Sequence, residues 1–294
     1  MKILIAISSK EHSGPTLDVG MNIARALDAS TTILDIGEKI NELSIKDISI
    51  TNELMDTWNI DRPGVDVLEW AYHYLVKNNF IVDNSEEDVF KNKIVKESTS
   101  NRTEVYLKGS SIKKLSLILR NGDIVTELRD EVRIYDYGLT IIGGSSKRSL
   151  AHDFIEYIES SILIVNSFNL DKNYRILLAV DDSHGTANAV KYAVRVSQAF
   201  KIKVDLINIS KDVHLKKGYN KGINRARKML RRCSIDTEIL LKIGDPVENI
   251  INTAGDDHII IMGASTLSPL AKFFVGSKPL DVIKKSTCPV LIVK

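Results

Sequence analysis

The chain has 294 residues, of which 44% are hydrophobic and 27% charged, the composition of a globular protein with room for two ordinary domains. A formal net charge of +2 is too small to favour nucleic acid or an anionic membrane as a partner. No apolar run approaches the roughly 18 residues that a membrane-spanning helix needs. The apolar run after Lys2 leads into charged residues instead of a small-residue cleavage site, so we interpret it as a first strand.

The two cysteines, Cys233 and Cys288, and the six histidines lack the paired spacing of a zinc site. Unpaired thiols are typical of a reducing compartment, and we therefore expect a cytoplasmic protein. Cys288 stands just before an apolar strand, which predicts a buried and unreactive thiol.

The chain repeats itself, with five apolar strands in each half. "KILIAIS" at 2–8 resembles "RILLAVD" at 175–181, and a helix pattern follows each strand. The remaining elements correspond in order: 31–36 with 204–209, 113–128 with 236–251, 139–144 with 258–263, and 161–166 with 289–294. Each half is therefore predicted to contain five strands that alternate with helices.

These strands are continuous apolar runs, which indicates parallel strands buried on both faces. The predicted fold class is α/β, with two Rossmann-like domains, each a five-stranded parallel sheet with helices on both faces. The polar segment 166–174 predicts a boundary between a domain at 1–170 and a domain at 171–294. In this topology the winding reverses between the first and fourth strands, so we expect ligand contacts just after those strands.

The first half carries an insertion around 80–111. Within it, "NKIVKES" and "TEVYLKG" flank the turn-like "TSNR", which predicts a β-hairpin. The polar segment 41–62 lacks periodicity and is interpreted as a long connection.

After the fourth strand of the second half, residues 264–275 form a longer excursion than the usual strand-to-helix loop. Gly263 and Gly276 bracket this excursion, and Ser277 is a suitable cap for a helix whose N–H groups and dipole favour an anion. Pro279 removes one N–H donor, and Asp281 places a carboxylate in the same turn. The loop therefore has the length and glycines of a phosphate loop, together with two residues that oppose it.

The first half has a shorter version of this loop, because positions 144 and 162 are 18 residues apart whereas the matching positions 263 and 290 are 27 apart. "GGSSKRSL" is what remains. We favour a capped turn with solvated Lys147 and Arg148 over an anion site there.

Both halves resemble universal stress protein domains, and the whole chain resembles a tandem universal stress protein. The second half has Gly263, two residues, Thr266, nine residues and Gly276-Ser277. The ATP-binding members of the family have Gly-x2-Gly-x9-Gly-Ser or Gly-Thr. "LSPLAKFFVGS", "ILLAVDDS", "GDPVENI" and "STCPVLIV" are further similarities. The resemblance covers most of the second half and the first half outside the insertion.

The resemblance implies an adenine nucleotide alpha hydrolase-like fold and an intramolecular pairing of the two domains through their final strands. It also implies an adenine nucleotide, ATP with Mg²⁺, bound in the second domain only. The implied nucleotide-binding residues are Asp181, Ser183 and Ile207 at the strand ends, and Gly263, Ser265, Thr266, Gly276, Ser277 and Lys278 near the phosphates. A further homo-oligomer or a protein partner is left open.

The sequence departs from the family pattern at four places. Thr266 replaces the second glycine of the loop, and Pro279 stands where a phosphate-holding hydroxyl residue is common. In the first half, Ser8 replaces the aspartate after the first strand and the loop is shortened. These departures motivate an alternative, a nucleotide-free scaffold whose domains pair and whose 80–111 insertion meets a partner protein. A slow ATPase is a weaker alternative, since no base or arginine is evidently placed for hydrolysis and no catalytic residue is assigned.

Three other patterns have simpler interpretations. The loops after the first strands, "SSKEHSG" and "DDSHGT", do not match the loop that PP-loop nucleotide hydrolases need. Asp181, Asp182 and Ser183 are interpreted as a turn and helix cap, with a Mg²⁺ shared with nucleotide phosphates as the alternative and no metal assigned to the protein alone. The basic run 216–232 has an apolar stripe at helical spacing, and we favour a solvated helix face over an acidic partner or nucleic acid.

Overall fold

The structure, a computed structural model, describes residues 1–37, 64–82, 93–99, 102–107, 114–144, 148–169, 171–210, 219–264 and 278–294. The predicted connection at 41–62 and residues 265–277 of the predicted phosphate loop lie outside these ranges. Among the described residues, no helix is both long and apolar enough to cross a bilayer.

The two halves contain the same succession of parallel strands and helices. The first has β1 (Lys2–Ile7), α1 (Gly14–Ala26), β2 (Ser30–Gly37), α3 (Val65–Lys77), β5 (Leu115–Asn121), α4 (Ile124–Tyr135), β6 (Leu139–Gly143), α5 (Arg148–Tyr157) and β7 (Ser161–Val165). The second has β8 (Arg175–Ala179), α6 (His184–Phe200), β9 (Val204–Ser210), α7 (Tyr219–Arg232), β10 (Thr237–Ile243), α8 (Pro246–Ala254), β11 (His258–Gly263), α10 (Lys278–Lys285) and β12 (Val290–Val293). The internal repeat predicted from the sequence is therefore present.

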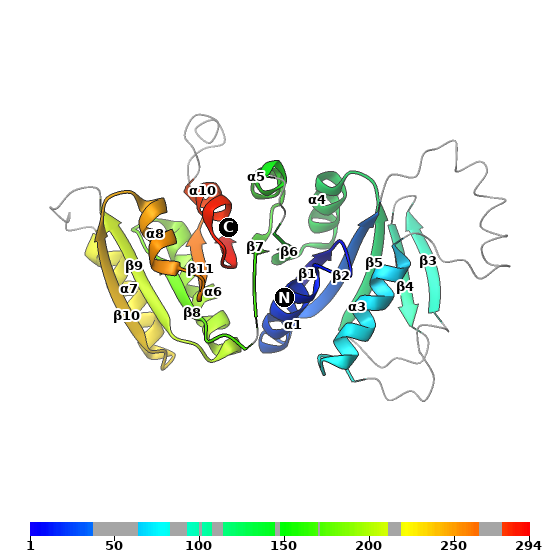
Figure 1. Cartoon of the computed structure of the whole chain (residues 1–294), viewed down its shortest axis with the longest axis horizontal. Coiled ribbons are helices and arrows are strands. Elements are labelled where there is room, and N and C mark those ends of the chain that lie inside the picture. The colour runs from blue at the N-terminus through cyan, green and yellow to red at the C-terminus, as the bar shows by residue number, and fades with distance from the viewer. Residues whose placement is uncertain are drawn as a thin grey trace.

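The strands form one sheet with the order β10-β9-β8-β11-β12-β7-β6-β1-β2-β5-β4-β3 (Figure 1). In each half the first strand lies between the second and the fourth, so the predicted switch point is confirmed. The final strands β7 and β12 pair antiparallel, with Leu163 opposite Leu291, and join the halves edge to edge. The predicted pairing of the halves through their final strands is thus confirmed.

The insertion in the first half forms the predicted hairpin, β3 (Lys93–Thr99) and β4 (Arg102–Leu107). Strand β4 pairs antiparallel with β5 and so extends the sheet beyond its five parallel strands. Arg102 of β4 is held by Glu131 of α4, and Glu131 also accepts a hydrogen bond of 2.8 Å from Arg120 of β5. This buried charge network ties the hairpin to the sheet and to the helix.

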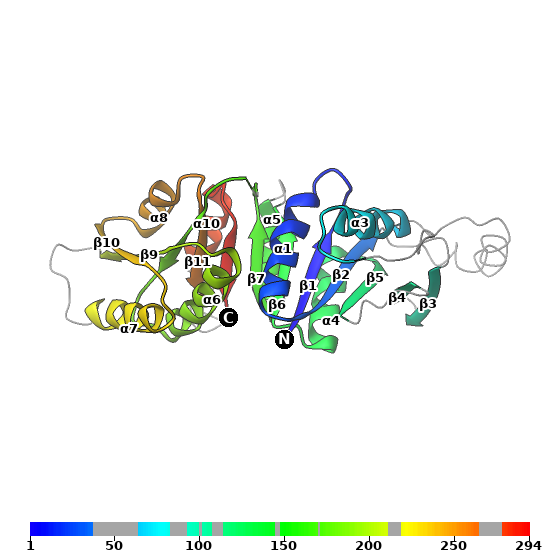
Figure 2. The ribbon, with the colours of Figure 1, turned by 90° about the horizontal axis from the view of Figure 1, so that it is seen from below.

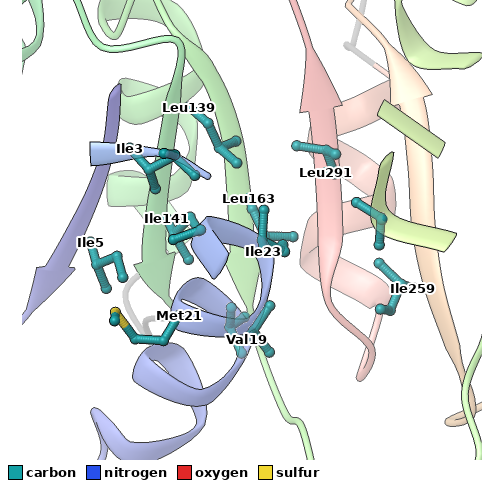
Figure 3. Close-up of a cluster of buried hydrophobic side chains, with 14 of the residues drawn as sticks. Ile3, Ile5, Val19, Met21, Ile23, Leu139, Ile141, Leu163, Ile259 and Leu291 are labelled. Carbon is teal, nitrogen blue, oxygen red and sulfur yellow. The ribbon is translucent and has the colours of Figure 1, made fainter. Parts of the chain in front are cut away.

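Helices cover both faces of the sheet, as the continuous apolar strands predict (Figures 1 and 2). Alternate strand residues point to opposite faces, so one cluster packs against α1, α3, α6 and α7 and the other against α4, α5, α8 and α10. Figure 3 shows the first cluster around Ile3, Ile5 and Val19, and Leu163 and Leu291 facing each other where the halves meet. Each such side chain stabilises the fold by about 1.5–3 kcal/mol when buried.

Strand β10 departs from the prediction of strands buried on both faces. It is an edge strand, and the side chains of Leu241 and Ile243 are 51% and 55% exposed. By contrast, the prediction for Cys288 is confirmed, because its side chain is buried and burial raises the pKa of its thiol.

Candidate functional site

The candidate site lies where β8, β9 and β11 end at the same edge of the sheet. Ala179 of β8 pairs with Ile207 of β9, and Leu178 of β8 pairs with Ile261 of β11. The chain segment after β8 therefore emerges between Ile207 and Gly263, at the reversal of winding where open α/β sheets bind ligands.

Asp181 follows β8 and organises the turn into α6. Its carboxylate accepts hydrogen bonds from the Ser183 N–H at 2.9 Å, the Ser183 hydroxyl at 2.6 Å and the Thr186 hydroxyl. The Ser183 hydroxyl in turn caps α6 by accepting a 3.3 Å bond from the N–H of Thr186. The interpretation of this stretch as a turn and helix cap is confirmed.

The charge on Asp181 is stabilised by the groups around it. Burial by itself would raise the pKa of Asp181, but the hydrogen bonds from Ser183 and Thr186, with the positive charge of Lys278, outweigh it and hold the pKa below its ordinary value. Asp181 is therefore an anionic acceptor at neutral pH, and Lys278 at the start of α10 lies near enough to act on it.

Gly263 has a steric role at the end of β11. A Cβ atom at this position would lie 2.4 Å from the carbonyl carbon of Gly185, and a Cβ at Gly185 would lie 2.8 Å from the oxygen of Ala264. These two glycines allow the first turn of α6 to touch the end of β11 directly. At this contact, main-chain atoms at the start of α6 lie directly against main-chain atoms at the end of β11.

Ile207 lies next to the site, near the end of β9. Its side chain is 1% exposed and packs in the second core cluster, and its carbonyl oxygen accepts a 2.9 Å bond from the N–H of Val180. The side chain and the carbonyl oxygen of Ile207 are therefore both engaged within the fold.

Asn208 is a residue of the site that the sequence analysis did not select. Its amide nitrogen donates a 2.7 Å bond to the carbonyl oxygen of Val180, which ties the ends of β8 and β9 together. The side chain is 1% exposed, and its Oδ1 atom has no hydrogen-bond partner in the part of the chain that the structure describes. A polar amide inside the apolar run "VDLINI" was the available signal.

The structure brings Asp181, Ser183, Gly263 and Lys278 to one edge of the sheet, next to Ile207. The other predicted contacts, Ser265, Thr266, Gly276 and Ser277, lie outside the described residues. Helix α10 begins at Lys278 and has Asp281 in its first turn. Among the described residues, no group of three or more His, Cys, Asp or Glu side chains could hold a metal ion.

The corresponding edge of the first half differs in chemistry. The Ser13 hydroxyl accepts bonds of 3.2 and 3.3 Å from the N–H groups of Ser8 and Ser9, so no carboxylate organises this turn. Asp35 takes the place of Asn208, because Ala6 pairs with Leu34 as Ala179 pairs with Ile207. Burial and, to a lesser extent, the charge of Asp66 raise the pKa of Asp35 to about 7.

Comparisons with known proteins agree with this architecture. Residues 173–294 match the model of the universal stress protein family. A universal stress protein from Helicobacter pylori is 25% identical over an alignment of 136 residues that covers 40% of this chain and 98% of that protein. A shorter universal stress protein solved in complex with cAMP is 23% identical, covers 42% of this chain and 98% of its own, and has a TM-score of 0.36.

A full-length match extends the similarity to the first half. The crystal structure of a universal stress protein from Archaeoglobus fulgidus covers 100% of this chain and 96% of its own, with 16% identity and a TM-score of 0.62. At this identity the match shows the fold, which is the α/β architecture described above. Residues 173–294 thus match the universal stress protein family, and the chain over its full length has the fold of the Archaeoglobus fulgidus universal stress protein.

Proposed function

We propose that the protein binds an adenine nucleotide, ATP or a related compound, in its second half only. The observation that carries the proposal is the meeting of Asp181, Gly263 and Lys278 at the switch point of β8 and β11. The nucleoside would lie over Ile207 beside Asp181, and the phosphates would lie in the loop from Gly263 to Lys278. The choice of adenine rests on the match of residues 173–294 to the universal stress protein family and on the loop spacing.

The chemistry of the described residues supports a bound anion at the start of α10. The first turn of a helix presents N–H groups and a positive dipole end to an anion, and Lys278 adds a cation there. Asp181 is a suitable acceptor for ribose hydroxyls, because its negative charge persists at neutral pH. Thr266, Pro279 and Asp281 weaken the site, so we expect an affinity lower than that of a complete family loop.

Calorimetry with ATP and Mg²⁺ tests the proposal. Lys278→Met should weaken binding by about three- to tenfold, as expected for the loss of one charged contact. Lys284→Met, in the last turn of the same helix, is the matched control and should leave the affinity unchanged. Thr266→Gly, which restores the family residue, should strengthen binding. No binding by the wild type at millimolar ATP would refute the proposal.

A nucleotide-free scaffold remains the second candidate function. Pro279 and Asp281 favour it, because both fall in the first turn of α10 and both oppose an anion there. The same calorimetric series separates the two candidates, since a scaffold requires that neither the wild type nor Thr266→Gly binds nucleotide. Nucleotide retained on the purified protein and released on denaturation would exclude the scaffold.

A further inference from the structure

Strand β10 leaves one side of its main chain open. It is the outermost strand of the second half, and among the described residues no strand pairs with its outer side (Figure 1). On its inner side the N–H of Val204 donates to Asp236 at 3.1 Å, and the N–H of Gly244 donates to Ser210 at 3.0 Å. Alternate residues of a parallel strand bond to the same neighbour. The odd-numbered residues therefore direct their N–H and C=O groups outward: Thr237, Ile239 and Leu241.

The equivalent edge of the first half is already occupied by a strand. There the N–H of Thr31 donates to Lys114 and the N–H of Gly122 donates to Gly37, the same pattern of bonds as on β10. The outward-facing residues of β5 are paired antiparallel with β4, Leu119 with Thr103 and Leu117 with Val105. The chain thus shows that this edge of the fold accepts an antiparallel strand.

Two equivalent leucines differ in exposure at these two edges of the sheet. Leu119 and Leu241 occupy equivalent positions in their strands. Leu119 lies five residues after Lys114 and Leu241 five residues after Asp236, and the carbonyl oxygens of Lys114 and Asp236 accept the first hydrogen bond from the neighbouring strand. The side chain of Leu119 is 0% exposed, whereas that of Leu241 is 51% exposed. Ile243 is 55% exposed on the same face. Two large apolar side chains are therefore exposed beside the outer edge of β10, which no strand among the described residues pairs with.

Basic side chains of α7 flank this open edge. Gly222 packs against the turn after β8, since its N–H donates to Asp182 at 2.8 Å, and helical spacing places Arg227 and Arg231 on the opposite flank. In the sheet order β10-β9-β8, the flank away from β8 is the one towards β10. A surface hollow of about 510 Å³ on α7 is lined by Asn224, Arg227, Lys228, Arg231 and Arg232. Among the described residues, none of these cations forms an ion pair.

We propose that the β10 edge binds an extended acidic segment of a partner protein, added antiparallel to β10 as β4 is added to β5. Helix α7 ends near the start of β10, so Arg231 lies towards Thr237 and Arg227 lies nearer the middle of the strand. An antiparallel segment would first place apolar side chains on Ile243 and Leu241. It would then place carboxylates near Arg227 and Arg231. Main-chain bonds give such a strand its affinity, and alternate side chains give its specificity.

The positive charge disfavours a second copy of this chain as the occupant. Antiparallel pairing of β10 with β10 of another copy would put the two α7 helices on the same face of a joined sheet. Each of these helices carries six exposed cations between residues 221 and 232: Lys221, Arg225, Arg227, Lys228, Arg231 and Arg232. The cations of the two α7 helices would repel each other, whereas an acidic segment would be attracted to them.

Fluorescence anisotropy with synthetic peptides tests the proposal on the full-length protein. The probe is a fluorescein-labelled peptide TVTVTETET, whose two valines and two glutamates share one face of a strand. The matched probe TVTVTKTKT replaces glutamate by lysine. We expect the acidic probe to bind at least about tenfold more tightly than the lysine probe, with the difference decreasing as salt is added. Equal binding of the two probes, or binding of neither, would overturn the proposal.

Two variants locate the site on the protein. Leu241→Pro removes an outward N–H and an exposed side chain without touching the bonds to β9, and it should weaken binding of the acidic probe by about tenfold or more. Arg227→Glu with Arg231→Glu should do the same. Lys221→Glu with Arg225→Glu changes the charge equally on the flank of α7 that lies towards β8 and should retain most of the affinity.

The variants also separate the alternatives. Circular dichroism checks that each variant is folded, and the arginine pair decides the question if Leu241→Pro is not, because those side chains are exposed. Unchanged binding by the arginine pair would refute the proposed surface. Light scattering that shows a wild-type dimer, converted to a monomer by Leu241→Pro, would assign the edge to a second copy and overturn the acidic partner.

Discussion

Replacement of Asp35 by Asn should stabilise the protein, and it should do so only above mildly acidic pH. Asp35 is 4% exposed at the end of β2, and burial, with the nearby charge of Asp66, raises its pKa to about 7. Asparagine keeps the shape of the side chain and has no proton to lose. The second half of the chain already has an amide at this position, Asn208, with 1% exposure.

The sign and size of the effect follow from proton linkage. An unfolded aspartate loses its proton near pH 4, whereas the folded protein retains it up to about pH 7. Between these values the folded state binds more protons, so its stability falls as the pH rises. A pKa of about 7 against an ordinary 3.8, at about 1.36 kcal/mol for each pH unit, amounts to about 4 kcal/mol above pH 7.

Urea unfolding followed by tryptophan fluorescence measures this difference. Both tryptophans lie in the first half of the sequence, at Trp58 and Trp70, so the signal reports on the half that contains Asp35. The free energy of unfolding of Asp35→Asn should match that of the wild type near pH 4 and exceed it by several kcal/mol at pH 8. In Asp66→Asn the loss of stability with rising pH should end at a lower pH than in the wild type, because removal of the Asp66 charge lowers the pKa of Asp35. A difference that is the same at both pH values would refute the reasoning.

Three further variants test the core, the site and the seam between the halves. Glu131→Ala leaves the buried guanidinium groups of Arg102 and Arg120 without a shared carboxylate and should cost about 3–5 kcal/mol in urea unfolding. Gly263→Ala places a methyl group 2.4 Å from Gly185 and should lower the thermal midpoint and weaken ATP binding together. Leu291→Ala, at a 0% exposed position between the halves, should cost about 2–5 kcal/mol; a loss below about 1 kcal/mol would show that the seam contributes little.

Much of the fold can be predicted from the sequence because the pattern of apolar strands and the residues of the turns between them predict the same elements. Apolar runs of four to eight residues at repeated intervals predict parallel strands, and the glycine-aspartate pairs at 122–123 and 244–245 mark the same turn in both halves. The glycines Gly122 and Gly244 have φ of 153° and 117°, and Asp123 and Asp245 cap the helices that follow. The turn residues and the repeated strands therefore predict the same fold.

What the sequence did not predict depends on neighbours that no local pattern encodes. Leu119 and Leu241 are the same residue type in similar strands, but Leu119 is covered by neighbours distant in the chain, among them β4 and the segment at Gly64. The buried Asn208 was also missed, because a single amide in an apolar run does not reveal the Val180 carbonyl oxygen that it binds. The direct contact of Gly185 with Gly263 joins residues that are far apart in the chain, and neither glycine alone predicts it.

The pairing of β7 with β12 affects how the sequences of the two halves can vary. Two separate identical domains that meet through their last strands must find each other in solution, and a substitution in one appears in both. In this chain the covalent link keeps the second strand at a high effective concentration, so pairing does not depend on protein concentration. Each half is then free to vary alone. The first half has a shorter loop and an added hairpin, while the second keeps the long loop and an open edge, all supported by one shared row of main-chain bonds.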